Sequence, residues 1–252
     1  MDLQLAGKRA LVTGGSKGIG LAVATSLVAE GCDVTISARD EQALEAAADA
    51  LRANGGKVAT ITCDLVQEAG IRDVAERCGP LDILVNNAGA IPPGSLGDID
   101  MDWWRAAWDL KVFGYIALTQ KLYANLRERQ GVIVNVIGTA GEKFVPGYIA
   151  GSAGNAALMA FTRALATASH RDGIRVVGIN PGPVGTERLT MMMKARAQSE
   201  LGDADRWHEL VASMPFGRFA EPGEIADAVT FLASPRSGYT SGTILTIDGG
   251  AA

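Results

Sequence analysis

Cysteine, histidine, long apolar runs and clusters of basic residues are all scarce in this chain of 252 residues. The three cysteines, Cys32, Cys63 and Cys78, have spacings that fit neither a zinc site nor a CxxC redox pair. We therefore expect reduced thiols, in the core or at the surface, as in a cytoplasmic protein, and we expect no metal site.

Membrane and nucleic-acid partners are also unexpected. No apolar run approaches the roughly 20 residues that span a bilayer, and the first residues lack the apolar segment of a secretory signal. The net charge is −5, and no run of lysines and arginines provides the basic surface that nucleic acids need. We therefore do not expect a polyanion as a partner.

Strand-like apolar runs alternate with helical patterns along nearly the whole chain, and 48% of the residues are hydrophobic. This alternation predicts βαβ units, and hence a parallel sheet with helices on both faces. We expect strands at Arg9–Val12, Asp33–Ala38, Val58–Cys63, Ile83–Val85, Val132–Val136, Arg175–Ile179 and Ile244–Ile247. We expect helices near 19–30, 41–53, 67–77, 101–128, 153–170 and 222–233. The length suits one α/β domain over residues 1–252, a doubly wound parallel sheet of seven strands.

The segment 187–218 interrupts this alternation between the sixth expected strand and the last helix. It carries Met191–Met193 and Trp207, and it follows the carboxyl end of a strand, where ligands bind in such sheets. We interpret it as a lid over the substrate. An insert that packs on the domain or contacts another subunit is the alternative.

The stretch Arg9–Gly20, RALVTGGSKGIG, joins a short apolar strand to a helix through closely spaced glycines. Glycine lets the backbone approach a ligand, and the free N–H groups at the start of the helix favour a pyrophosphate. Glycines also occur in ordinary turns, so this loop alone does not identify a nucleotide site.

Further motifs follow at the ends of later strands. Thr13-Gly14-xxx-Gly18-Ile19-Gly20 is followed by Asn86-Asn87-Ala88-Gly89, by Asn180-Pro181-Gly182-xxx-Thr186 and by Asp248-Gly249-Gly250. Over essentially its whole length the chain resembles the short-chain dehydrogenase/reductase family, which implies a Rossmann-like fold that binds a nicotinamide dinucleotide. The resemblance places these residues at the cofactor: Gly14, Ser16, Lys17, Gly18, Ile19, Gly20, Arg39, Asp64, Leu65, Asn87, Ala88, Gly89, Pro181, Gly182 and Thr186.

The end of the second expected strand bears on the choice between NADP and NAD. An acidic residue there would bind both ribose hydroxyls and repel a 2′-phosphate, but the sequence is Ser37-Ala38-Arg39. Arg39 and Lys17 provide two cations where that phosphate would lie. We therefore expect NADP(H), with NAD as second choice, because Asp40 follows Arg39 and both cations also suit a solvated surface.

The residues that usually transfer the proton in this family are replaced. The family pattern has a Ser after the fifth strand, a Tyr-xxx-Lys pair on the next helix and an Asn on the long fourth helix. The resemblance places Gly138 at the Ser, Gly151 at the Tyr, Asn155 at the Lys and Lys111 at the Asn position. The chain is therefore either an impaired relative or one that uses other groups.

Lys111 is the first candidate replacement. On a 3.6-residue period it shares a helix face with Trp104, Trp108, Tyr115, Leu118 and Leu122, so its ammonium emerges from an apolar stripe. Burial lowers the pKa of a lysine, which suits a proton donor or an anion anchor. A lysine that merely extends to solvent is the alternative.

Tyr148 is the other candidate acid, unless it is only a packed loop aromatic. Asn155 can still hydrogen-bond a ribose hydroxyl. Gly138 and Gly151 remove two side chains beside the nicotinamide, which should widen the pocket.

We therefore expect an oxidoreductase that transfers hydride between NADP(H) and a small carbonyl or alcohol, with Lys111 in place of the Tyr/Lys pair. The pocket would favour an anionic or a self-activating substrate. A non-catalytic dinucleotide-binding protein, acting as a sensor or assembly partner, is the main alternative. A lyase or dehalogenase ranks last, because it would not need the pyrophosphate loop. The resemblance also implies a homodimer or homotetramer.

Overall fold

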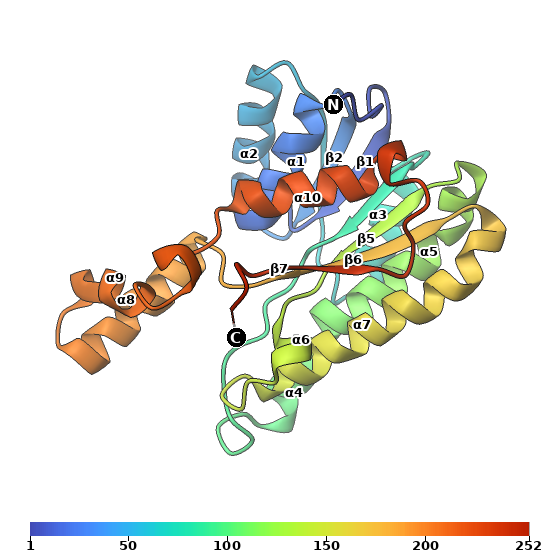
Figure 1. The fold of residues 1–252 in the computed structure, drawn as a ribbon. Helices are drawn as coiled ribbons and strands as arrows, with labels where there is room; N and C mark the ends of the chain where they lie inside the picture. Colours follow the sequence, from blue (N-terminus) through green and yellow to red (C-terminus); the bar gives the residue numbers. More distant parts are fainter. Residues whose placement is uncertain (252) are drawn as a thin grey trace.

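The computed structural model describes residues 1–251, which form a parallel sheet of seven strands between two layers of helices (Figure 1). The strands are β1 (Arg9–Thr13), β2 (Asp33–Ala38), β3 (Lys57–Thr62), β4 (Ile83–Asn86), β5 (Val132–Val136), β6 (Arg175–Pro181) and β7 (Ile244–Ile247). Their spatial order is β3-β2-β1-β4-β5-β6-β7, and each neighbouring pair is parallel. The doubly wound α/β fold expected from the sequence is confirmed, with strand bounds that differ by at most two residues.

Helices α1, α2 and α10 cover one face of the sheet, and α3, α5 and α7 cover the other (Figure 1). The α-helices are α1 (Gly18–Ala29), α2 (Glu41–Ala53), α3 (Glu68–Arg77), α4 (Met101–Trp108), α5 (Gly114–Glu128), α6 (Ala140–Lys143), α7 (Ile149–Ser169), α8 (Glu187–Leu201), α9 (Trp207–Val211) and α10 (Pro222–Ala233). A π-helical turn spans Asp109–Phe113, and short 3₁₀ turns span His170–Asp172, Ala204–Arg206, Pro215–Gly217 and Pro235–Ser237.

The central strand β1 shows why the chain folds into these layers. Successive side chains of a strand point to opposite faces, and both faces of this sheet are covered. Leu11 packs in the core beneath α3 and α5, whereas Val12 packs in the core beneath α1 and α10, and neither is exposed. The continuous apolar run in the sequence therefore serves two cores at once.

The expected helix ends are also present. Gly31 and Gly55 follow α1 and α2 with φ angles of 81° and 85°, a left-handed conformation that favours glycine after a helix. Pro222 is the first residue of α10, where its missing N–H costs no hydrogen bond.

Two helix predictions need correction. The helix expected over 101–128 is divided into α4, the π-helical turn and α5. The helix expected from 153 begins at Ile149, because Ala150, Gly151 and Ser152 are buried and belong to it despite the low helix propensity of glycine and serine.

The loops after β1 and β4 lie side by side at one end of the sheet, where the strand order reverses. This is the switch point at which ligands bind in doubly wound sheets. Residues 187–218 contain α8 and α9, which stand apart from the two helical layers (Figure 1). Among residues 1–251, no helix is both long and apolar enough to cross a membrane.

Candidate active site

The loop between β1 and α1 requires glycine at two positions of close approach. A Cβ at Gly14 would lie 3.0 Å from the Cα of Ala88, and a Cβ at Gly20 would collide with the carbonyl oxygen of Gly14. Lys17, which precedes α1, makes no side-chain hydrogen bond to the helix. The N–H groups of the first turn therefore remain free for a phosphate.

Asn87 holds this loop in place through hydrogen bonds to its backbone. Its Nδ2 donates to the carbonyl oxygens of Thr13 (2.9 Å) and Gly14 (3.3 Å). The backbone N–H groups of Asn87 and Ala88 both donate to Oγ1 of Thr13, at 2.9 and 3.0 Å. These bonds join the loops after β1 and β4, so Asn87 positions the backbone that faces the cleft.

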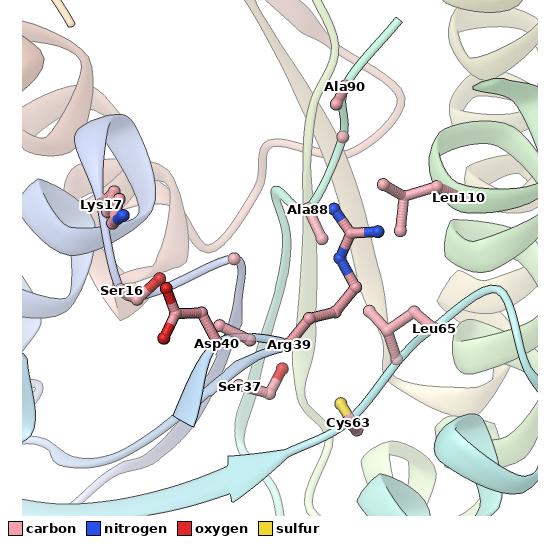
Figure 2. A pocket seen from close by; sticks show the side chains of 13 residues that line it. Ser16, Lys17, Ser37, Arg39, Asp40, Cys63, Leu65, Ala88, Ala90 and Leu110 are labelled. Carbon is pink, nitrogen blue, oxygen red and sulfur yellow. The ribbon is translucent and has the colours of Figure 1, made fainter. Parts of the chain in front are cut away.

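A cleft of about 650 Å³ lies at the carboxyl ends of β1 to β4 (Figure 2). Its lining includes seven of the expected cofactor residues: Gly14, Ser16, Lys17, Arg39, Leu65, Ala88 and Gly89. Sequence reasoning missed Cys63, Ala90 and Leu110, which also line it. Each of these three is the chain neighbour of a residue that was expected at the site, and this adjacency was the available signal.

Arg39 and Asp40 point in different directions. Figure 2 shows the Arg39 side chain extended into the cleft, while the Asp40 carboxylate is directed toward Ser16. Asp40 is the N-cap of α2, and its Oδ1 accepts the N–H of Ala43 at 3.0 Å. One carboxylate oxygen is therefore engaged by the helix, and Asp40, Arg39 and Lys17 are all exposed in the lining of the cleft.

The turn after β6 reaches the glycine loop from the opposite side. Thr186 is the N-cap of α8, and its Cγ2 would lie 3.1 Å from a Cβ at Gly18. The N–H of Gly182 donates to the carbonyl oxygen of Ile247 at 2.8 Å, and the carbonyl oxygen of Pro181 accepts the N–H of Thr139 at 3.1 Å. The structure thus brings the first and third sequence motifs together.

Ile19 and Asp64, which are also expected at the cofactor, make contacts within their own segments. Ile19 packs against the core beneath α1. The Oδ1 of Asp64 accepts the N–H of Val66 at 3.1 Å within its own turn, and Asp64 is not in the lining of the cleft.

The π-helical turn Asp109–Phe113 carries Lys111. Such a turn contains an extra residue and is often found at functional sites. It also breaks the 3.6-residue period expected for this helix: Trp104, Tyr115 and Leu118, which that period places on one face, belong to three different apolar clusters.

The Lys111 side chain is directed into the protein. Its methylene groups lie over the backbone of Gly89, where a Cβ would be 2.9 Å from its Cδ. Its Nζ donates to the carbonyl oxygen of Ile137 at 2.5 Å. Burial, with a smaller contribution from the charge of Arg188, lowers the pKa of Lys111 to about 8. The ammonium therefore lies beside Gly138 and loses its proton more readily than an ordinary lysine.

The Tyr148 ring fills the space beside Gly151. A Cβ at Gly151 would collide with the Cε1 and Cζ atoms of the Tyr148 ring, so the ring lies where a side chain at 151 would project. Tyr148 is half-buried, and burial raises its pKa while the charge of Arg188 lowers it to a lesser extent.

Gly138 and Asn155 form a similar pair. Gly138 has a φ of 134°, and a Cβ there would lie 2.9 Å from the Nδ2 of Asn155. Asn155 is 2% exposed, and its Oδ1 has no hydrogen-bond partner among residues 1–251. A buried amide oxygen without a partner is costly, so this atom is an acceptor available to a bound group.

Arg188 is a further residue of this region that sequence reasoning did not select. It lies in the first turn of α8, and its guanidinium donates to the carbonyl oxygen of Ile91 at 3.2 Å. Its effect on the pKa of both Lys111 and Tyr148 places its charge near both groups. The signal in the sequence was its position two residues after Thr186.

The likeness to known proteins covers nearly the whole chain. A family profile described as "Enoyl-(Acyl carrier protein) reductase" matches residues 14–252. An acetoacetyl-CoA reductase of Shinella zoogloeoides is 35% identical, and the match covers 96% of this chain and 97% of the relative. The chain belongs to the short-chain dehydrogenase/reductase family. The expected family membership is thus confirmed.

Solved structures of the family agree with this one closely. L-Sorbose reductase from Gluconobacter frateurii, in complex with NADPH and L-sorbose, has a TM-score of 0.94 and 32% identity over 99% of this chain and 98% of that chain. An NADPH-bound short-chain oxidoreductase from Pseudomonas aeruginosa PAO1, described as containing an atypical catalytic center, has a TM-score of 0.89 and 32% identity over 98% of each chain.

The chain is accordingly an NAD(P)-dependent oxidoreductase of the short-chain type, a class that acts on carbonyl and alcohol substrates. Several similar solved structures hold NADPH, and a 7α-hydroxysteroid dehydrogenase holds NADH. The glycine loop, the uncapped start of α1 and the adjoining cleft of this chain fit such a dinucleotide.

Proposed function

We propose that this chain reduces a small carbonyl compound with NADPH, or oxidises the corresponding alcohol with NADP, and that Lys111 is its proton donor and acceptor. The observation that carries the proposal is the position of the Lys111 ammonium, 2.5 Å from the carbonyl oxygen of Ile137 and thus next to Gly138. Gly138 stands where relatives usually have the serine of the proton-transfer group. The ammonium therefore reaches the region of the missing groups.

Two observations support NADP(H) over NAD(H). Arg39 and Lys17 line the cleft beyond β2, and neither takes part in an ion pair within residues 1–251. Asp40 also lines the cleft, but its Oδ1 accepts the N–H of Ala43 at the start of α2. A 2′-phosphate would thus meet two cations, with the single carboxylate of Asp40 beside them, and the planar guanidinium of Arg39 suits a phosphate.

Bound NADPH would supply a hydride to the carbonyl carbon. Lys111, as an ammonium, would donate the proton to the carbonyl oxygen and then take up a proton from water. A pKa of about 8 leaves most of Lys111 protonated at neutral pH, yet makes it a stronger acid than an ordinary lysine. The raised pKa of Tyr148 makes its phenol the weaker acid of the two.

Asn155, Gly151 and Tyr148 would have supporting roles. The unpartnered Oδ1 of Asn155 can accept a hydrogen bond from a ribose hydroxyl. The Tyr148 ring fills the space beside Gly151 and forms a wall of the substrate region.

We further propose that residues 1–252 form one domain and that 187–218 serve as its lid. The support is the placement of α8 and α9 outside the helical layers, together with the bond from Arg188 to the carbonyl oxygen of Ile91. That bond links the start of α8 to the loop after β4, so closing and opening of the lid would make and break it.

The test combines binding with turnover. Protein fluorescence and the melting temperature are measured with NADPH and NADH, and NADPH oxidation is followed with a panel of small aldehydes, ketones and oxo acids. We expect both nucleotides to bind, NADPH more tightly, and at least one carbonyl compound to be reduced. Binding without any turnover would favour the non-catalytic alternative, and activity without a nucleotide would favour a lyase or dehalogenase. No response to either nucleotide would contradict the proposal as a whole.

A further inference from the structure

Two positively charged side chains, those of Lys111 and Arg188, contact the loop that follows β4. The methylene groups of Lys111 pack on Gly89, and the guanidinium of Arg188 donates to the carbonyl oxygen of Ile91 at 3.2 Å. Gly89 and Ile91 are two residues apart, so their Cα atoms are separated by at most about 7 Å. The first turn of α8 therefore adds a second positive charge to the region that already holds Lys111.

Neither charge is neutralised within the described chain. Over residues 1–251, no carboxylate lies within ion-pair distance of Lys111 or Arg188, and both bond instead to backbone carbonyl oxygens. Elsewhere on α8 the pattern is different, because Arg196 pairs with Glu200 at 2.8 Å. Two neighbouring cations without a counter-ion repel one another, and the charge of Arg188 does contribute to the lowered pKa of Lys111. A bound anion would relieve that repulsion.

Arg188 is exposed, but the residues next to the loop that it contacts are apolar. Ile91 is 4% exposed and lies in one apolar cluster with Trp104 and Tyr148. The Cδ1 of Ile91 and the Nε1 of Trp108 would lie 3.4 and 3.2 Å from a Cβ at Gly154, so these side chains meet over the same glycine. The region offers two positive charges beside the half-buried rings of Trp104, Trp108 and Tyr148.

We propose that Lys111 and Arg188 form an anion site, and that the substrate is a small oxo acid whose carboxylate Arg188 binds. This inference rests on the proposed oxidoreductase function and specifies its substrate class. The carboxylate would stay intact while the carbonyl carbon takes a hydride from NADPH and the carbonyl oxygen takes a proton from Lys111. The products would be a hydroxy acid and NADP. The short alkyl chain would lie against the half-buried ring of Trp108.

The carboxylate would also assist Lys111. A negative charge at Arg188 offsets the repulsion that favours the neutral amine, so Lys111 becomes more fully protonated when the substrate is bound. The same charge that selects the substrate would thus keep the proton donor in its active form.

The experiment compares Arg188→Met with Arg196→Met, a matched control on the same helix whose charge pairs at the surface. Reduction of pyruvate and acetoacetate is measured beside that of their neutral amides, and the dissociation constant of NADPH is measured for each variant. We expect the wild type to prefer the acids. Arg188→Met removes the bond to Ile91 and so affects both substrate classes, but it should lower kcat/KM for the acids about 10- to 100-fold more than for the amides, with little change in NADPH binding. Arg188→Lys should recover part of the loss, and Arg196→Met should behave as wild type.

A binding measurement separates this inference from the proposed function. Propionate cannot be reduced. It should raise the melting temperature of the wild-type complex with NADP and leave the melting temperature of the Arg188→Met complex unchanged. That result would support the anion site even if no substrate were turned over. Equal turnover of acids and amides by both proteins would overturn the inference and leave the oxidoreductase function standing. A weaker NADPH complex of Arg188→Met, with unchanged preference for acids, would assign Arg188 to the cofactor phosphates and would also overturn it.

Discussion

The aromatic ring of Tyr148 lies in the space into which any side chain at Gly151 would project. Tyr148 immediately precedes α7, and Gly151 is in the first turn of that helix. The ring can pack there only because residue 151 has no side chain. Gly138 with Asn155, and Gly89 with Lys111, show the same arrangement. Each of these three glycines thus leaves space for one of the side chains expected at the site, so substitutions within a pair are expected to be coupled.

Replacing Gly151 with alanine tests the first pair. The added methyl group must displace the Tyr148 ring, so Gly151→Ala should lower the free energy of unfolding by about 1–3 kcal/mol, measured by urea denaturation. In a Tyr148→Ala background the space is free, and the same change should be neutral or stabilising. The control is Gly223→Ala in the first turn of α10, where nothing lies within 4 Å of the new Cβ. Strictly additive effects of the two changes would mean that the residues do not share this space.

Restoring a serine at Gly138 should fail. The φ of 134° is a conformation that side chains rarely adopt, and the new Cβ would press on the Nδ2 of Asn155. We expect Gly138→Ser to cost about 1–3 kcal/mol of stability and to give no gain in NADPH oxidation. Gly97→Ser, at a site with open space, should leave stability unchanged. A stable and more active Gly138→Ser protein would show that the usual proton-transfer geometry is still available.

Much of the fold could be predicted because local and tertiary requirements agree. The apolar run of β1, in which Leu11 and Val12 serve opposite cores, is visible in the sequence, as are the stops at Gly31 and Gly55. The π-helical turn Asp109–Phe113 was not predictable, because it contains neither glycine nor proline and its hydrogen-bond shift depends on what the helix packs against.

The candidate site, like the fold, could be predicted from the sequence only in part. The glycine loop and the Asn87 turn follow from spacing within motifs, so sequence reasoning could select them. Contacts between distant segments could not be selected. Arg188 and Ile91 are 97 residues apart in the chain, and the collision between Tyr148 and position 151 depends on how the chain enters α7. These relationships appear only when the backbone path is known.

The choice of nucleotide should depend on Arg39. Its guanidinium is exposed and extends into the cleft, so Arg39→Ala should weaken NADPH binding by about 10-fold, the loss of one charge-assisted contact, and leave NADH binding nearly unchanged. Fluorescence titration measures both constants. Arg52→Ala on α2, whose charge pairs with Glu45 and Asp49, is the control. If Arg39→Ala weakened the binding of NADPH and NADH equally, Arg39 would not contact the 2′-phosphate.

The most direct test of Lys111 is the pH dependence of single-turnover NADPH oxidation, measured on the wild type and on Lys111→Met with a carbonyl substrate found in the panel. Reduction requires the ammonium form, so the wild-type kcat/KM should be level below its pKa of about 8 and fall as the pH rises through it. Oxidation of the alcohol requires the neutral amine and should rise over the same range. Lys121→Met, on an exposed part of α5, is the control for removing a charge.

We expect Lys111→Met to bind NADPH as the wild type does and to reduce the substrate about 10²- to 10⁴-fold more slowly. Its kcat/KM should show no fall as the pH rises through about 8. A Lys111→Met protein with the wild-type rate and the same pH profile would contradict the assignment of the proton to Lys111.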